Sequence, residues 1–278
     1  MPEKKFKFFT GLTQYHFNVL FDLIGGEEGI RQITYVYGQK TPRRTLDHRK
    51  FSSKNRLFMM LIRMRRGVPI IDLAHIFGIG KTQCGVICYA MIRVTYEYLY
   101  LLQPHMFMSA EQQKKNMPLP FMRFKNLRVI IDCQQGNTFS SYKHGNTEKY
   151  LIGTSGYGSV IFCSDGFEGN KSDKEILKAS GIMNYLEKGD SVMADRGFNV
   201  KTELAEIGVN LIKPPDFKKK RQCLNPQEEI LTKDTATARI YVEHVMKSIK
   251  DWRILRNTVP MSVHDILPDM EHIVAWGG

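Results

Sequence analysis

Two aspartates in the C-terminal half of the chain stand where metal ligands are often found. Asp132 follows the apolar run "RVII" and Asp195 follows the apolar run "SVMA". Both runs are typical of buried strands, and an open α/β sheet collects its ligands outside the ends of its strands. For either aspartate taken alone, the alternative is a turn-forming role at the end of a strand.

Glu243 is a third carboxylate, and we expect a long helix to carry it. The segment "TATARIYVEHVMKSIKDWRIL" has apolar residues at helical spacing, and Glu243 falls one step round from that stripe. An acid at this position can face the sheet. The alternative is a solvated face on which Glu243 pairs with Arg239 and Lys247, each pair contributing roughly 0.3 kcal/mol.

Three carboxylates in one cleft repel one another unless cations neutralise them, and hard oxygen ligands favour Mg²⁺ or Mn²⁺. Two such ions about 3.5–4 Å apart activate a water or a DNA 3′-hydroxyl and stabilise the leaving oxygen of a phosphodiester. The pattern therefore predicts a two-metal site for phosphodiester chemistry. Its catalytic and metal-binding residues are Asp132, Asp195 and Glu243. On the same helix, Arg239 and Lys250 are the candidate phosphate-binding residues.

The elements that must position these residues alternate between strand and helix. A strand at 128–133 is followed by a hairpin around Gly156-Tyr157-Gly158 and by a helix with a capping box at Ser172 and Glu175. A strand before Asp195, a second helix, a short strand and the long helix complete the order β-β-β-α-β-α-β-α. This order predicts an α/β fold with a mixed sheet flanked by helices.

Residues 51–102 match a helix-turn-helix. Ala74 is the small residue where two helices cross, and Gly78 is the turn residue that tolerates a positive φ. The second helix begins with polar residues where recognition helices contact base edges, namely Lys81, Thr82 and Gln83. A compact pair of helices that binds nothing is the alternative, because it can show the same pattern.

Positive charge is concentrated beside this unit. The formal net charge is +12, and the segment from residue 40 to residue 66 holds ten Lys or Arg against one acid. Basic clusters gain free energy on DNA because each neutralised phosphate releases counterions. We therefore expect Arg63, Arg65 and Arg66 to contribute to DNA binding, with a solvated basic surface as the alternative.

The chain is predicted to have four parts. These are an N-terminal helical segment at 1–50, the helix-turn-helix region at 51–102, a linker at 103–126 and the catalytic domain at 127–278. No run is long enough for a membrane span, and the N-terminus lacks the features of a signal peptide. We therefore expect no membrane partner and a location inside the cell. The five cysteines include no C-x-x-C pair, so we expect small buried side chains rather than disulfides or a zinc ribbon.

Several ordered motifs resemble the Harbinger-like DDE transposases of animal genomes. They are "DLAHIFGIGKTQCGVI", "VIIDC", "SSYKHGNTEKYLIG", "SDKEI", "DSVMADRGF" and "ARIYVEHVMKSIKDWRIL", and the likeness covers roughly residues 6–275. The resemblance implies a ribonuclease-H-like catalytic domain, cleavage and strand transfer at terminal inverted repeats of double-stranded DNA, and a nuclear location. It places the triad on Asp132, Asp195 and Glu243. It also implies a homo-oligomeric synaptic complex, with a separate DNA-binding protein as a further candidate partner.

One segment departs from the family pattern. Only nine residues separate Asp132 from Tyr142, where relatives have a longer polar segment. A shortened hairpin can misplace Asp132, and displacement by about 1 Å already affects such chemistry. The alternative function is therefore a domesticated or decayed copy that binds DNA without catalysis, and a structure-specific nuclease is a third. The basic segment 217–222 is either a nuclear signal or a solvated loop.

Overall fold

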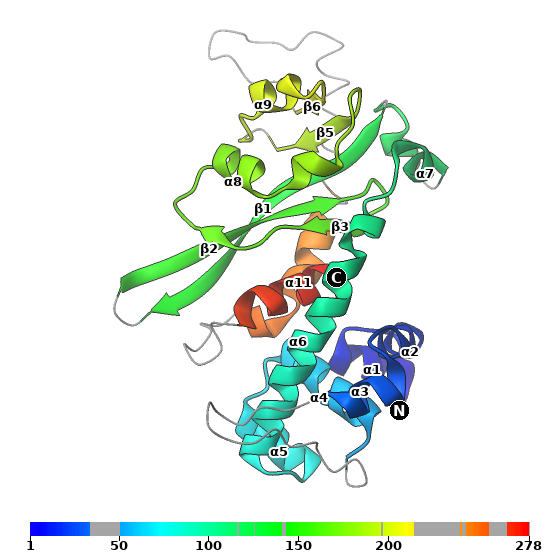
Figure 1. The fold of residues 1–278 in the computed structure, drawn as a ribbon, viewed down its shortest axis with the longest axis vertical. Coiled ribbons are helices and arrows are strands. Elements are labelled where there is room, and N and C mark those ends of the chain that lie inside the picture. The colour runs from blue at the N-terminus through cyan, green and yellow to red at the C-terminus, as the bar shows by residue number, and fades with distance from the viewer. Residues whose placement is uncertain are drawn as a thin grey trace. The chain divides into compact units, whose positions relative to one another are not determined.

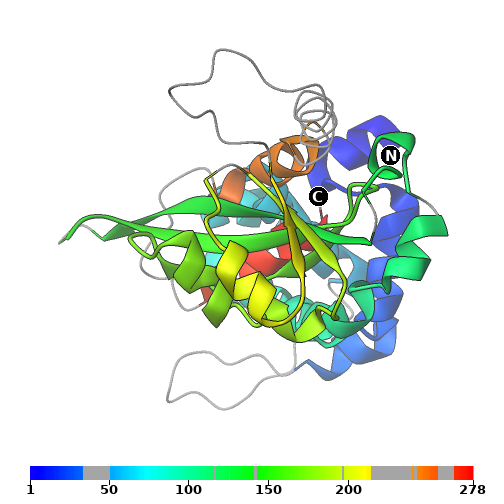
Figure 2. The ribbon, with the colours of Figure 1, turned by 90° about the horizontal axis from the view of Figure 1, so that it is seen from above.

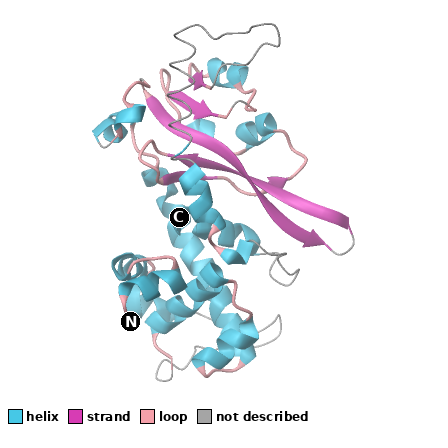
Figure 3. Cartoon of the chain, turned by 180° about the vertical axis from the view of Figure 1, so that it is seen from behind, coloured by secondary structure: helices cyan, strands magenta, loops and turns pink. Residues whose placement is uncertain are grey.

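The computed structural model describes residues 1–33, 51–115, 117–124, 126–140, 143–195, 197–213, 240, 243–255 and 266–277. These residues form two compact units. The first is helical and joins Met1–Leu102 to Ile249–Gly277, and the second is Gln103–Ser248. Figure 1 labels the elements, and Figure 3 shows that the strands belong to the second unit.

Local sequence signals set the ends of the helices in the first unit. The Ser52 side chain accepts a hydrogen bond from the Asn55 amide and caps α4, and Gly67 ends that helix with a φ of 65°. The helices are α1 (Glu3–Thr10), α2 (Gln14–Leu23), α3 (Gly26–Gln32), α4 (Ser53–Arg66), α5 (Ile70–Phe77), α6 (Lys81–Met106) as far as Leu102, and α11 (Leu267–Gly277).

Trp252 ties the C-terminal segment to the N-terminal helices. Its side chain is buried, and a Cβ added at Gly11 or at Gly277 would lie 2.9 Å or 2.7 Å from the indole. The absence of a side chain at both glycines is therefore what admits the ring. Trp252 and α11 belong to the helical unit, so the segment predicted as the catalytic domain, 127–278, contributes to both compact units.

The second unit is built on a mixed sheet. Its strand order is β3-β2-β1-β5-β6, with the short β4 paired to β2. The first three strands are antiparallel, whereas β5 runs parallel to β1 and β6 runs parallel to β5. This confirms the predicted α/β fold of ribonuclease-H-like type, preceded by a helical region. The strands are β1 (Leu127–Ser140), β2 (Lys143–Thr154), β3 (Val160–Cys163), β4 (Phe167–Glu168), β5 (Ser191–Ala194) and β6 (Asn210–Ile212).

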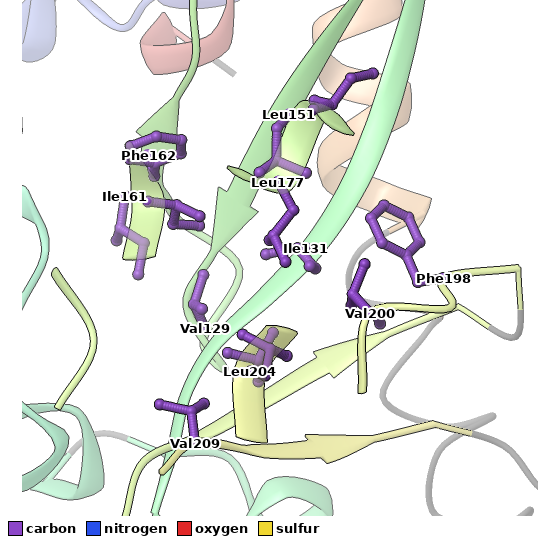
Figure 4. Close-up of a cluster of buried hydrophobic side chains, with 14 of the residues drawn as sticks. Val129, Ile131, Leu151, Ile161, Phe162, Leu177, Phe198, Val200, Leu204 and Val209 are labelled. Carbon is purple, nitrogen blue, oxygen red and sulfur yellow. The ribbon is translucent and has the colours of Figure 1, made fainter. Parts of the chain in front are cut away.

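Helices cover both faces of this sheet. On one face, Val129 and Ile131 of β1 pack in a buried cluster with Leu177 of α8 (Asp173–Ala179) and Leu204 of α9 (Lys201–Glu206) (Figure 4). Figure 2 shows helical residues 243–248, in orange, on the opposite side of the sheet. Side chains alternate between the two faces of a strand. Asp132 therefore belongs to the face on the side of that helix.

The segment predicted as a linker, 103–126, packs into the second unit instead. It forms α7 (Ala110–Lys115) and a 3₁₀ turn at Leu119–Phe121. Four of its apolar side chains are buried, whereas Leu119 and Met122 are exposed, and the Phe107 ring lies 5.1 Å from that of Tyr185. Of the three prolines in this segment, Pro118 precedes the 3₁₀ turn and Pro120 lies within it. The buried apolar residues of the segment are Phe107, Met117, Phe121 and Phe124.

Polar contacts fix β1 and β5 at the ends where both strands begin. The Ser191 amide donates to the Asn126 carbonyl at 2.7 Å, and the Asn126 side chain donates to the Gly189 carbonyl at 3.1 Å. Next to them, Arg128 Nε lies 3.9 Å from Asp190 Oδ2, and both side chains are buried. A slip of one residue would break these contacts and turn the buried side chains to the wrong face.

Replacing Arg128 by Met keeps the apolar stem and removes the charge. We expect a loss of about 3 kcal/mol in the free energy of unfolding, because the Asp190 carboxylate is left buried without its cation. Urea unfolding of the whole protein at pH 7 measures this. Glu187→Gln is the control, since Glu187 also pairs with Arg128 but its side chain is 76 % exposed. Equal effects of the two changes would contradict the proposed anchoring role.

Glu203 joins α8 to α9 on the other side of the cluster. Its buried Oε1 lies 2.5 Å from Lys174 Nζ and 3.7 Å from Lys178 Nζ. The hydrogen bond from Lys174 is the main cause that lowers the pKa of Glu203. A carboxyl with a lowered pKa in the folded state stabilises the protein above its unfolded pKa, and this contribution is lost as the pH falls through the folded value.

Glu203→Gln should therefore be less stable than the wild type at pH 7. The difference should shrink as the pH falls below about 4.3, the ordinary pKa of glutamate. Urea unfolding between pH 7 and pH 3 follows it. Glu206→Gln, an exposed site on the same helix, should show little change with pH. A Glu203→Gln difference that stays constant over this range would contradict the ionic clamp.

Candidate active site and nucleic-acid interface

The pairing of β1 with β5 brings two of the predicted metal ligands to neighbouring positions. Ile131 is registered opposite Ala194 in the parallel pair, and Asp132 and Asp195 are the next residues of the two strands. Neighbouring strands lie about 4.8 Å apart. Both aspartates are half-buried, and the Asp195 carbonyl accepts a hydrogen bond from the Phe198 amide in the turn after β5. Asp195 therefore follows a strand and begins a turn, and its position in the chain is next to that of Asp132 in the register of the two strands.

The segment after Asp132 continues as a strand. Asp132 pairs with Ile152, and the antiparallel ladder extends to Ser140 opposite Lys143, with one irregularity after Thr138. Asp132 is thus paired with β2 on one side of β1. On the other side, it comes directly after Ile131, the last residue of β1 that pairs with β5. The described part of the shortened segment thus pairs with β2 up to Ser140, while Tyr142 lies outside the described residues.

Glu243 lies in the helical segment 243–250. Val245, Met246 and Ile249 of this segment are buried, as the apolar stripe predicted. A Cβ at Gly158 would lie 3.9 Å from Val245, so the helix packs beside the turn between β2 and β3. Glu243 itself is exposed. This exposure matches the solvated-face alternative, although the helix lies on the same side of the sheet as Asp132.

The donor set suits a hard divalent cation only in part. Asp132 and Asp195 supply carboxylate oxygens at adjoining strand positions, which are the ligands that Mg²⁺ and Mn²⁺ prefer. Among the described residues, no three His, Cys, Asp or Glu side chains are close enough together to hold a metal ion. Of the two predicted phosphate-binding residues, Lys250 is exposed and Arg239 lies outside the described residues.

Behind Asp132, on the α8 face, lies a group that sequence reasoning did not find. Lys149 Nζ donates to the Lys171 carbonyl at 3.1 Å and lies 3.9 Å from the Asp173 carboxylate. Lys149 thereby connects β2 to the start of α8. Burial, with the negative charges of Asp173 and Asp132, raises the pKa of Cys133 to about 12, so this thiol stays protonated at neutral pH.

The predicted helix-turn-helix has the expected geometry. Helices α5 and α6 meet at 103°, within the range of about 90–120° typical of this motif, and Gly78 in the turn has a φ of 64°. Ala74 is buried at the crossing. Lys81 and Thr82 are exposed and Gln83 is half-buried. No single helix in the described ranges is long and apolar enough to cross a membrane, although α5 and α6 meet that test as a bent pair.

The three arginines of α4 have partners within the helical unit. Arg63 donates to the Val68 carbonyl at 3.0 Å, and the Arg66 guanidinium lies 3.9 Å from the centre of the Phe8 ring. Arg65 lies 3.6 Å from the Asp251 carboxylate. These contacts hold the end of α4, so DNA binding by the three arginines stays a prediction. The part of the basic segment at 40–50 and the candidate nuclear signal at 217–222 lie outside the described residues.

Comparison with known proteins assigns the chain to a family. The family model of the DDE superfamily endonucleases matches residues 122–276, more than half of the chain. The chain belongs to the DDE superfamily of endonucleases. A second family model, the helix-turn-helix of DDE superfamily endonucleases, matches residues 49–100 and confirms the motif read from the sequence.

One curated relative of this DDE superfamily member extends over most of both chains. It is described as the probable transposase for insertion sequence element IS702 of Microchaete diplosiphon. The two are 23 % identical over 268 residues, which cover 92 % of this chain and 87 % of the relative. No solved structure matches. The comparisons thus confirm the superfamily and its helix-turn-helix, whereas the Harbinger-like subtype stays a prediction.

Replacing Lys81 and Gln83 together by Ala should weaken binding to duplex DNA about 10-fold or more, because side chains at the start of a recognition helix contact base edges or phosphates. Fluorescence anisotropy at several salt concentrations measures the affinity. Lys201→Ala, which removes an exposed charge from α9, is the control and should change little. Unchanged affinity in the double variant would refute the recognition-helix assignment.

Proposed function

We propose that this DDE superfamily endonuclease is a transposase that cleaves DNA and transfers strands at the terminal inverted repeats of its own element. The observation that carries the proposal is the register of β1 with β5, which places Asp132, within β1, next to Asp195, directly after β5. With Glu243 they form the proposed catalytic triad. Two Mg²⁺ or Mn²⁺ ions would supply the activation of the attacking oxygen and the stabilisation of the leaving oxygen when bound.

The chain's own residues divide this task. Asp132 is set by two neighbouring strands and Asp195 by the turn after β5, so both carboxylates are positioned by the sheet. Glu243 comes from a helix packed on the sheet, and we propose that its carboxylate completes the ligand set when DNA and metal ions are present. Arg239 and Lys250, on the same segment, would hold DNA phosphates, while α6 recognises the sequence of the element's ends.

The resemblance in the motifs supports further parts of the proposal. We propose a Harbinger-like subtype, a nuclear location and a homo-oligomeric complex that holds two DNA ends together. A separate DNA-binding protein as partner belongs to the same proposal. None of these depends on the register that carries the catalytic assignment.

A second candidate function is favoured by a specific observation. Glu243 is exposed, and the described residues hold no group of three metal-binding side chains. A domesticated or decayed copy that binds DNA through residues 51–102 and catalyses nothing fits this arrangement. A structure-specific nuclease, the third candidate, would cleave DNA without inverted repeats.

Cleavage of a duplex that carries the element's own ends tests the proposal. With Mg²⁺ or Mn²⁺ the wild type should yield new 3′-hydroxyl ends, and Asp195→Asn and Glu243→Gln should each reduce the rate at least about 100-fold, since a ligated metal contributes several kcal/mol. Glu206→Gln, on the exposed face of α9, is the matched control.

The outcomes separate the candidates. If Glu243→Gln cleaves at the rate of the wild type and Asp195→Asn does not cleave, the third ligand is not Glu243. Binding of the ends by all four proteins without cleavage would identify a copy that has lost catalysis. If the wild type cleaves duplexes that lack inverted repeats as fast as it cleaves the element's own ends, the protein is a structure-specific nuclease.

A further inference from the structure

Four side chains on α4 and α6 form a cluster that the proposed function does not use. Met59 and Arg63 are four residues apart on α4, and Cys84 and Cys88 are four residues apart on α6. Residues at this spacing share one face of a helix. The Cys84 Sγ lies 3.7 Å from the Met59 Sδ, and all three sulfur-bearing side chains are buried. The helical unit thus encloses three sulfur atoms between two helices.

The two thiols are linked to each other and to a positive charge. A hydrogen bond between them lowers the pKa of Cys84 and raises that of Cys88, and the Arg63 guanidinium is close enough to favour the thiolate of both. Arg63 is itself fixed by its hydrogen bond to the Val68 carbonyl. The cluster therefore has one thiol that ionises more readily than usual and a cation that offsets the charge of a thiolate.

Ion size and ligand number indicate which metal suits these donors. Three sulfurs bound in a plane to one ion at about 2.3 Å each are about 4 Å apart, close to the 3.7 Å between Cys84 and Met59. Soft thiolate and thioether donors select Cu(I) or Zn²⁺. Structural Zn²⁺ requires four ligands. In the described part of the chain, no third His, Cys, Asp or Glu joins the two cysteines, so the cluster fits Cu(I).

We propose that the helical unit binds one Cu(I) ion through Cys84, Cys88 and Met59. Both thiols release their protons to solvent as the two Cu–thiolate bonds form, and the thioether adds without any change in charge. The resulting centre carries one negative charge, which Arg63 offsets. No electron transfer is involved, since the metal stays Cu(I).

Binding would join α4 to the recognition helix. Cys84 lies one residue after Gln83, so the ion would hold the first turn of α6 against α4. Because a ligand that binds only the folded state stabilises it, Cu(I) should raise the melting temperature of the protein. This site depends on nothing in the sheet unit, so its test is independent of catalysis.

The experiment titrates Cu(I), supplied as its acetonitrile complex without oxygen, into the full chain in competition with bathocuproine disulfonate. The parent protein carries Cys133→Ser and Cys223→Ser, because Cys133 is half-buried and Cys223 lies outside the described residues. We expect one ion per chain. Cys84→Ser and Cys88→Ser should each weaken binding at least 100-fold, and Met59→Leu should weaken it about 10-fold.

Two further measurements keep the outcome clear if a serine variant folds poorly. Met59→Leu conserves core volume, and its circular dichroism should match that of the parent. X-ray absorption of the loaded parent should show three sulfur neighbours at about 2.3 Å. Undiminished affinity in Cys84→Ser, or a shell containing nitrogen or oxygen, would overturn the site. Affinity no greater than that of glutathione for Cu(I) would also overturn it.

Discussion

The parallel pairing of β1 with β5 is the constraint on which the candidate active site depends. Its register is set far from the carboxylates, by the Asn126 contacts with Gly189 and Ser191 and by the buried pair of Arg128 with Asp190. After one irregularity between Leu127 and Val129, the two strands advance residue by residue from Val129 opposite Val192 to Ile131 opposite Ala194, so the contacts where they begin bear on which residues meet beyond Ile131 and Ala194. The structure therefore separates the groups that fix the geometry from the groups that would perform the chemistry.

The two faces of the sheet serve different purposes. On one face the cluster around Ile131 and Leu204 is sealed by α8 and α9, with Glu203 as an ionic connection between the helices. On the other face, a helix that carries Glu243 packs through Val245 and Met246. The sheet thus sets the positions of Asp132 and Asp195, while Glu243 belongs to a helix on which it is exposed to solvent.

The helical unit is built from both ends of the chain. Trp252 fills a space that Gly11 and Gly277 leave open, and it brings the C-terminal residues to the N-terminal helices. The recognition helix is part of the same unit and shares its core with α4 through Met59 and Cys84. The burial of Cys84 agrees with the expectation from the sequence that the cysteines are small buried side chains.

Local patterns in the sequence were sufficient to predict most of the order of the elements, the capping box at Ser172, the glycine turn of the helix-turn-helix and the apolar stripe of the helical segment that carries Glu243. These depend on hydrogen bonds and periodicities within a few residues. Tertiary structure alone decided that 103–126 packs as part of the sheet unit, that the chain after residue 248 returns to the helical unit, and that Lys149 meets Asp173. Such contacts join residues far apart in sequence, so no local pattern encodes them. The sequence predicted that Asp132 and Asp195 share a site, but the pairing that sets them at neighbouring positions is the register of β1 with β5.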